Sequence, residues 1–226
     1  GENGTGRLAE VDFIVQQIVS RLIGEQPLKG LIALVTAGPT YEPIDPVRFI
    51  ANRSSGKQGY AIADALNKAG ADVTLVSGPT DESLTTNANT FIRVVTAQQM
   101  FDECTESLPA DIVVCTAAVA DWKPKSPQTR KMKKRGNSTP PAIELATNPD
   151  ILQHIGTLKK GRPKLVIGFA AETDDLIKNA TGKLASKGCD MVVANDVSEG
   201  KVFGSDQTDA YFVSSEKPVH HANICL

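Results

Sequence analysis

Two segments of the sequence combine small and polar residues in patterns suited to holding phosphate. Ser54-Ser55-Gly56-Lys57 precedes a stretch with helical spacing, and the unpaired amides and partial positive charge of a helix N-terminus attract anions. Asn148-Pro149-Asp150-Ile151 has the same character, because Asn is a favoured N-cap and Pro is favoured at the first helical position. Helix capping without a ligand explains either segment taken alone, so neither decides the function.

A run of five cations in six residues lies further along the chain, Arg130-Lys131-Met132-Lys133-Lys134-Arg135. A solvated loop is the ordinary explanation. The second is a flap that lays a lysine across a polyphosphate, where it stabilises charge developing in a transition state. A nucleic-acid patch is disfavoured, because the chain has 24 Lys and Arg against 26 Asp and Glu and the run lacks interleaved aromatic residues.

Several well-known motifs are absent. Gly-x-Gly-x-x-Gly does not follow the first expected strand, and a P-loop fails because Ala51 and Gln58 stand where Gly and Ser or Thr are required. No Ser/His/Asp set stands out. The four cysteines form no Cys-x-x-Cys pair, and His220-His221 has no nearby acidic or thiol partner, so we expect no metal site built by the protein and treat these histidines as a polar tail.

The elements that must position these segments alternate along the chain. Short apolar runs rich in Val and Ile are typical of strands buried on both faces of a parallel sheet, and amphipathic stretches separate them. The pattern predicts an α/β fold with a doubly wound, mostly parallel, Rossmann-like sheet flanked by helices. The expected strands are 31–36, 73–76, 92–95, 112–115, 165–169 and 191–194, with an edge strand or hairpin arm at 209–213; the expected helices are 7–23, 57–69, 97–108, 151–158 and 174–186.

Two stretches, 39–56 and 121–148, contain several prolines and fit neither pattern. Loops of this length in a compact domain are usually functional or disordered, so we expect long active-site loops. Ligands bind outside the carboxyl ends of strands in an open parallel sheet. That rule places a site among four segments with small or polar residues: 36–40, 115–121, 168–173 and 194–196.

Length and composition narrow the class of protein. The chain has 226 residues, 41% of them hydrophobic, and a net charge of -2, which is ordinary for a globular domain. No apolar run approaches the length of a membrane span, so no membrane association is expected. Cysteines without a disulfide pattern favour a reducing, cytoplasmic setting.

Taken together, the motifs resemble those of phosphopantothenoylcysteine synthetases, which form the C-terminal half of bacterial bifunctional coenzyme A biosynthesis proteins. The resemblance covers roughly residues 30 to 215, in the family's order. One departure is Gln58, where many members have methionine. The matching segments are Thr36–Arg48, Asn52–Gly59, Ala117–Asp121, Lys131–Lys134, Asn148–Ile151, Gly168–Thr173 and Ala194–Val197.

The resemblance implies a CTP-dependent ligase that joins 4'-phosphopantothenate to L-cysteine through an acyl-cytidylate, releasing pyrophosphate and CMP. It also implies Mg²⁺ bound with the triphosphate and a homodimer. It assigns residues 30–226 to the synthetase domain and residues 1–29 to a linker and helix. A decarboxylase half belongs to the full-length family members, and no flavin is expected in this part.

The resemblance also assigns roles to individual residues. Lys131 should stabilise the transition state at the α-phosphate, and Asn52 should hold the acyl intermediate with support from Arg48. Pro149, Asp150, Ile151 and Leu152 should place helix amides on the phosphates. Phe169 should pack on the base or ribose. The remaining nucleotide contacts fall on Cys115, Thr116, Ala117, Asp121, Lys183 and Lys187; the two lysines lie four apart, so they share one helix face.

Two other functions stay open at this stage. The first is an NAD(P)-dependent oxidoreductase on the same fold, weakened by the absent glycine fingerprint. The second is a non-catalytic nucleotide-binding module, weakened by the presence of Arg48, Asn52 and Lys131.

Overall fold

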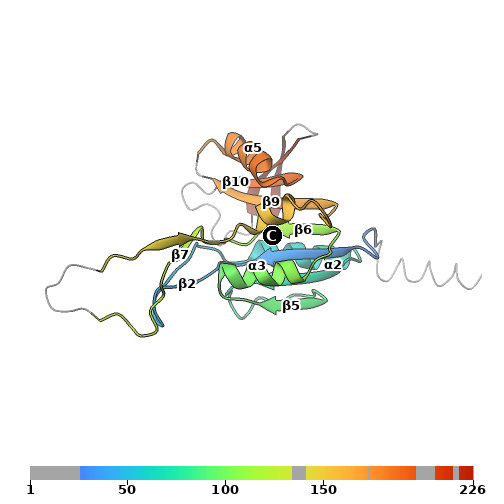
Figure 1. Ribbon diagram of the computed structural model, residues 1–226. Helices are drawn as coiled ribbons and strands as arrows, with labels where there is room; N and C mark the ends of the chain where they lie inside the picture. Colours follow the sequence, from blue (N-terminus) through green and yellow to red (C-terminus); the bar gives the residue numbers. More distant parts are fainter. Residues whose placement is uncertain (1–25, 134–140, 173, 197–206, 216–218, 226) are drawn as a thin grey trace, which may run out of the picture.

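The protein is built on one eight-stranded sheet (Figure 1), seen in a computed structural model that describes residues 26–133, 141–172, 174–196, 207–215 and 219–225. The strand order is β12-β11-β10-β9-β6-β1-β4-β5. The six strands from β10 to β5 run parallel, and β11 and β12 add an antiparallel edge. The strands of this sheet are β1 (Ile32–Ala37), β4 (Asp72–Ser77), β5 (Thr90–Arg93), β6 (Ile112–Cys115), β9 (Leu165–Glu172), β10 (Met191–Asp196), β11 (Gln207–Ser214) and β12 (His220–Cys225).

Helices cover both faces of the sheet. Tyr60 and Ala63 of α2 pack with Val35 and Leu75 on one face. The other core brings helices α3, α4 and α5 together against the opposite face of the strands. The described helices are α2 (Lys57–Lys68), α3 (Ala97–Glu106), α4 (Ile151–Gly156) and α5 (Leu176–Lys187). The predicted doubly wound α/β fold is therefore confirmed.

The sheet reverses its direction of growth between β1 and β6. From β1 the chain adds β4 and β5 on one side, and then returns to add β6, β9 and β10 on the other. Thr36 and Cys115 lie opposite each other in the β1–β6 register, close to the carboxyl ends of both strands. This reversal is the position where open α/β sheets bind ligands.

The two proline-containing stretches form an arm that projects from the sheet (Figure 1). The first holds the short antiparallel pair β2 (Glu42–Pro43) and β3 (Phe49–Ile50), and the second holds β7 (Trp122–Pro124) and β8 (Leu145–Thr147). We expected loops here. Strands of two or three residues are too short to show alternation, and β2 and β7 also contain proline, which is why the sequence did not indicate them.

The C-terminal part corrects a second expectation. His220 and His221 belong to the edge strand β12, where they pair with Phe212 and Tyr211 of β11, so the expected polar tail was wrong. The run at 209–213 is one arm of the hairpin. The helix expected at 7–23, and Lys134 and Arg135 of the basic run, lie outside the described residues. Within the part that the structure describes, no helix is long and apolar enough to cross a membrane.

Candidate active site

A cavity of about 770 Å³ opens at the carboxyl ends of β1 and β6, where the sheet reverses its direction of growth. Twelve of the fourteen residues assigned from the sequence line it, from five separate stretches of chain. Arg48 and Lys131 do not line it. The twelve are Asn52, Cys115, Thr116, Ala117, Asp121, Pro149, Asp150, Ile151, Leu152, Phe169, Lys183 and Lys187.

Hydrogen bonds between the ends of β1 and β6 shape the floor of the cavity. The Thr116 hydroxyl donates to the Thr36 carbonyl over 2.5 Å, and the Ala117 amide donates to the Thr36 hydroxyl over 3.3 Å. Beyond the strands, the amide of Ala120 donates to the buried hydroxyl of Thr40 over 3.0 Å. The backbone from 115 to 121 is therefore held in place beside the cavity.

Helix α2 points its N-terminus at this floor. Gly56 precedes the helix with a φ of 78°, and its position contributes no side-chain cap. A Cβ at Gly59 would lie 2.5 Å from both the Ala37 Cβ and the Thr116 Oγ1, so glycine lets the first turn approach the strand ends. Because first-turn amides have no helical partner, this N-terminus is suited to holding phosphate oxygens.

The N-terminus of α4 differs from the expectation. Asp150, not Asn148, is its N-cap, and the carboxylate accepts a hydrogen bond from the Gln153 amide over 2.8 Å. A carboxylate also complements the helix dipole better than an amide. The Asn148 side chain instead donates to the Ala120 carbonyl over 2.8 Å, which ties the loop before α4 to the cavity floor.

Two lysines of α5 reach the cavity from the same helix face, as their spacing predicted. Lys183 Nζ donates to the Phe169 carbonyl over 2.6 Å. Lys187 forms an ion pair with Asp150 and keeps 27% of its side chain exposed. Lys187 therefore offsets the negative charge that Asp150 places at α4, so this wall can accept a phosphate.

Asn52 lies where the arm meets the cavity. Its Nδ2 donates to the Val119 carbonyl over 3.0 Å, and the residue lines the cavity. This bond fixes the orientation of the Asn52 carboxamide, because only its nitrogen can donate to a carbonyl. The position of the side-chain oxygen is thereby fixed as well.

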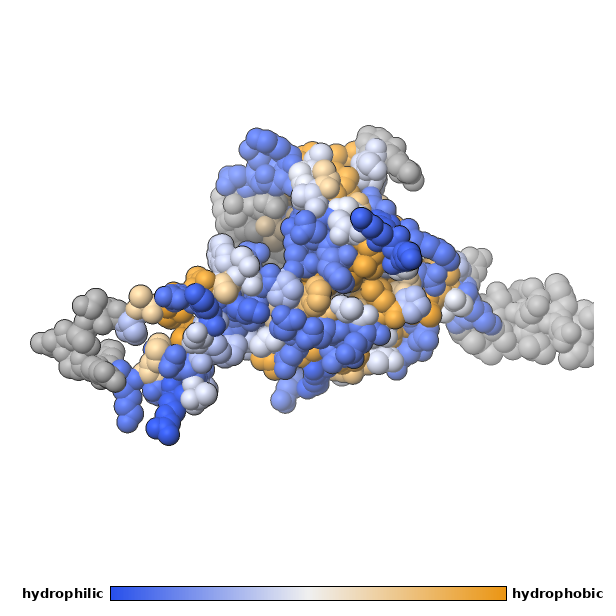
Figure 2. All heavy atoms as spheres, in the orientation of Figure 1, coloured by the Kyte–Doolittle hydropathy of each residue, from blue (hydrophilic) through white to orange (hydrophobic). Residues whose placement is uncertain are grey.

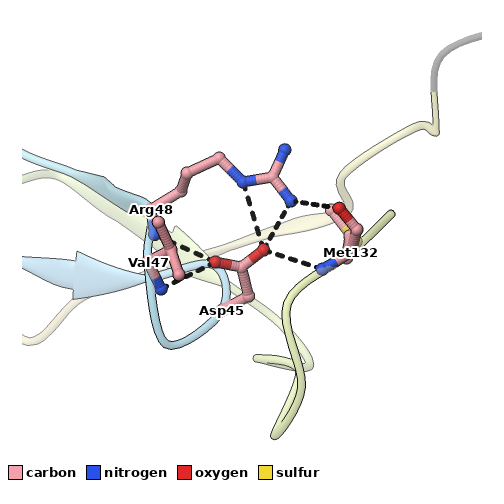
Figure 3. Close-up of polar contacts among 4 residues, drawn as sticks. All are labelled: Asp45, Val47, Arg48 and Met132. Carbon is pink, nitrogen blue, oxygen red and sulfur yellow. Dashed lines mark hydrogen bonds and ion pairs between the residues drawn. The ribbon is translucent and has the colours of Figure 1, made fainter. Parts of the chain in front are cut away.

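Arg48 and Lys131 belong to the arm, and Figure 3 shows Arg48 beside Asp45 and Met132. The Arg48 guanidinium donates to Asp45 through Nε and Nη2, at 3.1 and 2.5 Å, and Nη2 also donates to the Met132 carbonyl over 3.1 Å. The expected support of Asn52 by Arg48 does not appear among these contacts. Lys131 directly precedes Met132 and is exposed.

The thiol at the cavity, Cys115, is not an activated nucleophile. Burial, together with the neighbouring Cys189, raises the pKa of Cys115 to about 12, although Lys183 partly opposes the shift. A thiol acts as a nucleophile through its thiolate. The raised pKa therefore disfavours Cys115 as a nucleophile near pH 7.

The carboxylates at the cavity are Asp121 and Asp150. Within the described ranges, no three His, Cys, Asp or Glu residues gather into a set that could hold a metal ion. Mg²⁺ is usually bound by one or two carboxylates together with substrate phosphates and water. The donor set thus fits a Mg²⁺ that arrives on a triphosphate.

Sequence reasoning left several lining residues out of the site. Ser54, Ser55 and Gly56 were recognised as an anion-binding helix entry but not assigned. Asn148 and Asn195 each have a buried side-chain oxygen without a hydrogen-bond partner, and both line the cavity. Both asparagines lie in segments that the sequence placed near the site, 148–151 and 194–196, but the sequence alone did not indicate that their side-chain oxygens are buried without a partner.

Comparison with known proteins agrees with this architecture. The family model described as "DNA/pantothenate metabolism flavoprotein C-terminal domain" matches residues 28–224. The Coenzyme A biosynthesis bifunctional protein CoaBC of Haemophilus influenzae is 44% identical over 208 residues, which cover 92% of this chain and 51% of that protein. The CoaBC of Mycobacterium tuberculosis H37Rv is 42% identical over 232 residues, covering 95% and 54%. The chain therefore spans about half the length of these curated relatives.

Solved structures show the same fold. The crystal structure of the C-terminal domain of a CoaBC protein superposes with a TM-score of 0.71 at 38% identity, covering 88% of both chains. Cab2, solved in complex with phosphopantothenate-cysteine, shares the fold with a TM-score of 0.66 at 18% identity, covering 97% of this chain and 88% of Cab2. The chain belongs to the family of DNA/pantothenate metabolism flavoprotein C-terminal domains, and it is similar to the C-terminal domain of CoaBC.

Proposed function

We propose that this chain is a CTP-dependent phosphopantothenate–cysteine ligase of coenzyme A biosynthesis. One observation carries the proposal: residues from five separate stretches of chain, assigned to the site from the sequence, meet in one cavity at the sheet's reversal point. The relatives at 42–44% identity are coenzyme A biosynthesis proteins. A dinucleotide-dependent oxidoreductase is not favoured, because the turn after β1 lacks the glycine fingerprint.

In the first proposed step, a carboxylate oxygen of 4'-phosphopantothenate attacks the α-phosphorus of CTP. The bond from this phosphorus to the pyrophosphate oxygen breaks, and an acyl-cytidylate and pyrophosphate form. The α2 amides, Lys183 and Lys187 hold the phosphates, and Lys131 balances the charge that gathers at the α-phosphate. Positioning and charge stabilisation of this kind need no protein nucleophile, in keeping with the neutral thiol of Cys115.

In the second step, the free amine of L-cysteine attacks the acyl carbon of the intermediate. The carbon–oxygen bond to the cytidylate breaks, CMP leaves, and the amine loses a proton as the amide forms. Asn52 is placed to hold the intermediate, because its carboxamide is oriented by the Val119 carbonyl at the edge of the cavity.

Mg²⁺ bound to the triphosphate would neutralise phosphate charge and make pyrophosphate a better leaving group. Asp121 is the carboxylate best suited to hold it, because Asp150 is already paired with Lys187 and caps α4.

A product assay tests the proposal. The chain is incubated with 4'-phosphopantothenate, L-cysteine and Mg²⁺, with CTP or ATP in turn, and CMP, AMP and pyrophosphate are quantified. CMP equal to the amide product is expected, with little AMP. Turnover with ATP but not with CTP would contradict the CTP assignment. Binding of NADPH without any nucleotide turnover would favour the oxidoreductase.

A homodimer is part of the proposal, supported by apolar side chains on the arm (Figure 2). Monomers seldom keep such large apolar groups together on a projecting surface, and a second copy would cover them. Sedimentation should show a dimer that Phe49→Ser weakens. The exposed fractions are 58% for Val47, 50% for Phe49, 55% for Trp122, 42% for Ile143 and 49% for Leu145.

Two assignments complete the proposal. Residues 30–226 form the synthetase domain, and residues 1–29 a linker and helix that join it to a decarboxylase half in the full-length protein. A cytoplasmic location suits the free cysteines among the described residues.

A further inference from the structure

The side chain of Asp45 is fully buried at the tip of the arm, between β2 and β3. Oδ1 accepts hydrogen bonds from the amides of Val47 and Arg48, both over 2.9 Å. Oδ2 accepts from the Arg48 guanidinium and, over 3.1 Å, from the amide of Met132 (Figure 3). Five N–H donors therefore converge on one carboxylate.

Met132 belongs to the other half of the arm, 87 residues further along the chain. Both of its backbone groups are engaged, since its carbonyl accepts from Arg48 Nη2. A second link lies four residues earlier, where the Gln128 amide donates to the Ile44 carbonyl over 2.9 Å. The segment between these links contains Lys131, so its backbone is fastened on both sides of the lysine.

Because Asp45 stays ionised near neutral pH, its hydrogen bonds between the two halves of the arm do not change with pH in that range. The Arg48 guanidinium and the three backbone amides hold the pKa of Asp45 far below its usual range, although burial opposes them. Hydrogen bonds to an ionised acceptor are about twice as strong as neutral ones. Among the described residues, the groups that face Asp45 are the Arg48 guanidinium and the amides of Val47, Arg48 and Met132.

We propose that Asp45 is a positioning residue. It fixes the backbone at Lys131 through the Met132 amide and Arg48, so that the lysine side chain extends to the α-phosphate from a fixed backbone position. The proposal rests on the proposed function, because it concerns the lysine of that reaction. It also gives Arg48 a task other than contact with Asn52: its guanidinium bridges the two halves of the arm.

Hydrogen exchange tests the fastening without reference to activity. Asp45→Asn keeps the shape of the side chain, but it removes the charge and replaces one acceptor with a donor. We expect the Met132 amide to exchange at least about tenfold faster in this variant, because its acceptor is lost. Asp81→Asn is the matched control, since Asp81 accepts a turn amide from Ser83 elsewhere on the surface. Unchanged exchange in Asp45→Asn would overturn the proposal.

Kinetics then test positioning. In Asp45→Asn, we expect kcat to fall about ten- to a hundredfold with the KM for CTP nearly unchanged, because displacing a reacting group by about 1 Å has effects of this size. Combined with Lys131→Ala, the loss should not exceed that of Lys131→Ala alone, since both changes remove one contribution. Additive losses, or faster exchange with full kcat, would overturn the positioning role.

Two further outcomes remain distinguishable. If Asp45→Asn does not fold by circular dichroism, Arg48→Lys replaces it, because a lysine cannot bridge Asp45 and the Met132 carbonyl with a fork of donors. If the unmodified chain makes no CMP, the proposed function fails and the positioning role falls with it. Exchange at Met132 still reports whether the two halves of the arm are fastened.

Discussion

The cavity and the arm are held together by different forces. The cavity stands on strand ends whose neighbours are wholly buried, such as Ala37, Val76 and Val114. The arm has little core of its own. It depends on short strand pairs, the stacked rings of Tyr41 and Phe49 at 4.0 Å, and the buried charge of Asp45.

This difference matches a division of chemical work. Groups that orient a nucleotide need a fixed frame, and packed cores supply one because they do not deform continuously. In the proposed mechanism, Lys131 interacts with negative charge that develops only during the reaction. Such a lysine is better placed on a segment whose backbone is held by hydrogen bonds while its side chain stays exposed. Substitutions in the arm should therefore mainly change kcat, while substitutions in the cavity should mainly change nucleotide affinity and the free energy of unfolding.

The strongest test of this division is Lys131→Ala. Loss of one group that stabilises transition-state charge typically lowers kcat by about 10²–10³. We expect that loss with CTP affinity changed less than about threefold, measured by calorimetry and a CMP assay, because Lys131 lies outside the cavity lining. Lys133→Ala, two residues away and also exposed, is the control and should keep nearly full turnover.

Asn52→Asp tests the junction between the two regions. Aspartate cannot donate to the Val119 carbonyl, which Asn52 does over 3.0 Å, and it adds negative charge beside the phosphates. We expect overall turnover to fall about a hundredfold while acyl-cytidylate accumulates, because in the proposed mechanism Asn52 holds the intermediate for the cysteine step. Rapid quenching and chromatography would detect the intermediate. Asn67→Asp, which loses a comparable bond to Asn89 on the surface, should show no accumulation.

How far the sequence leads differs between the two regions. The cavity was largely predictable, because buried parallel strands read as apolar runs and their carboxyl ends must meet at one edge. Two details there were not: Asp150 displaced Asn148 as the cap of α4, and the buried side-chain oxygen of Asn195 is left without a partner.

The arm was visible from sequence only as two unusual loops. Its strand pairs join Trp122 to Thr147 and Glu42 to Ile50, and nothing in a local window specifies the longer of these contacts. The link from Asp45 to Met132 spans 87 residues. A carboxylate so far from its partner is indistinguishable from a surface aspartate until the fold is known.

Gly59→Ala tests the frame of the cavity. The added methyl would overlap Ala37 and Thr116, and overpacking of this kind destabilises by about 1–3 kcal/mol. Urea unfolding should show that loss, together with weaker CTP binding, since α2 must move away from the floor. Gly182→Ala in α5 meets nothing within 4 Å, so it should instead stabilise by up to about 1 kcal/mol through helix propensity. Equal effects of the two changes would contradict the close approach of α2.

The smallest expected effect is an alkaline loss of stability that belongs to the cavity floor and not to the arm. An unfolded cysteine releases its proton near pH 8.5, whereas Cys115 in the folded protein holds its proton to a pKa of about 12. Between these values the native state binds more protons, so stability is complete below about pH 8.5 and falls as pH rises toward 12. Between pH 8.5 and pH 9.5, the free energy of unfolding should therefore fall by about 1 kcal/mol more in the parent chain than in Cys115→Ala. If the free energy of unfolding fell equally with pH in the two chains, the thiol would already be ionised or solvated in the folded protein. The cavity floor would then be less protected from water than the packing of β1 against β6 requires.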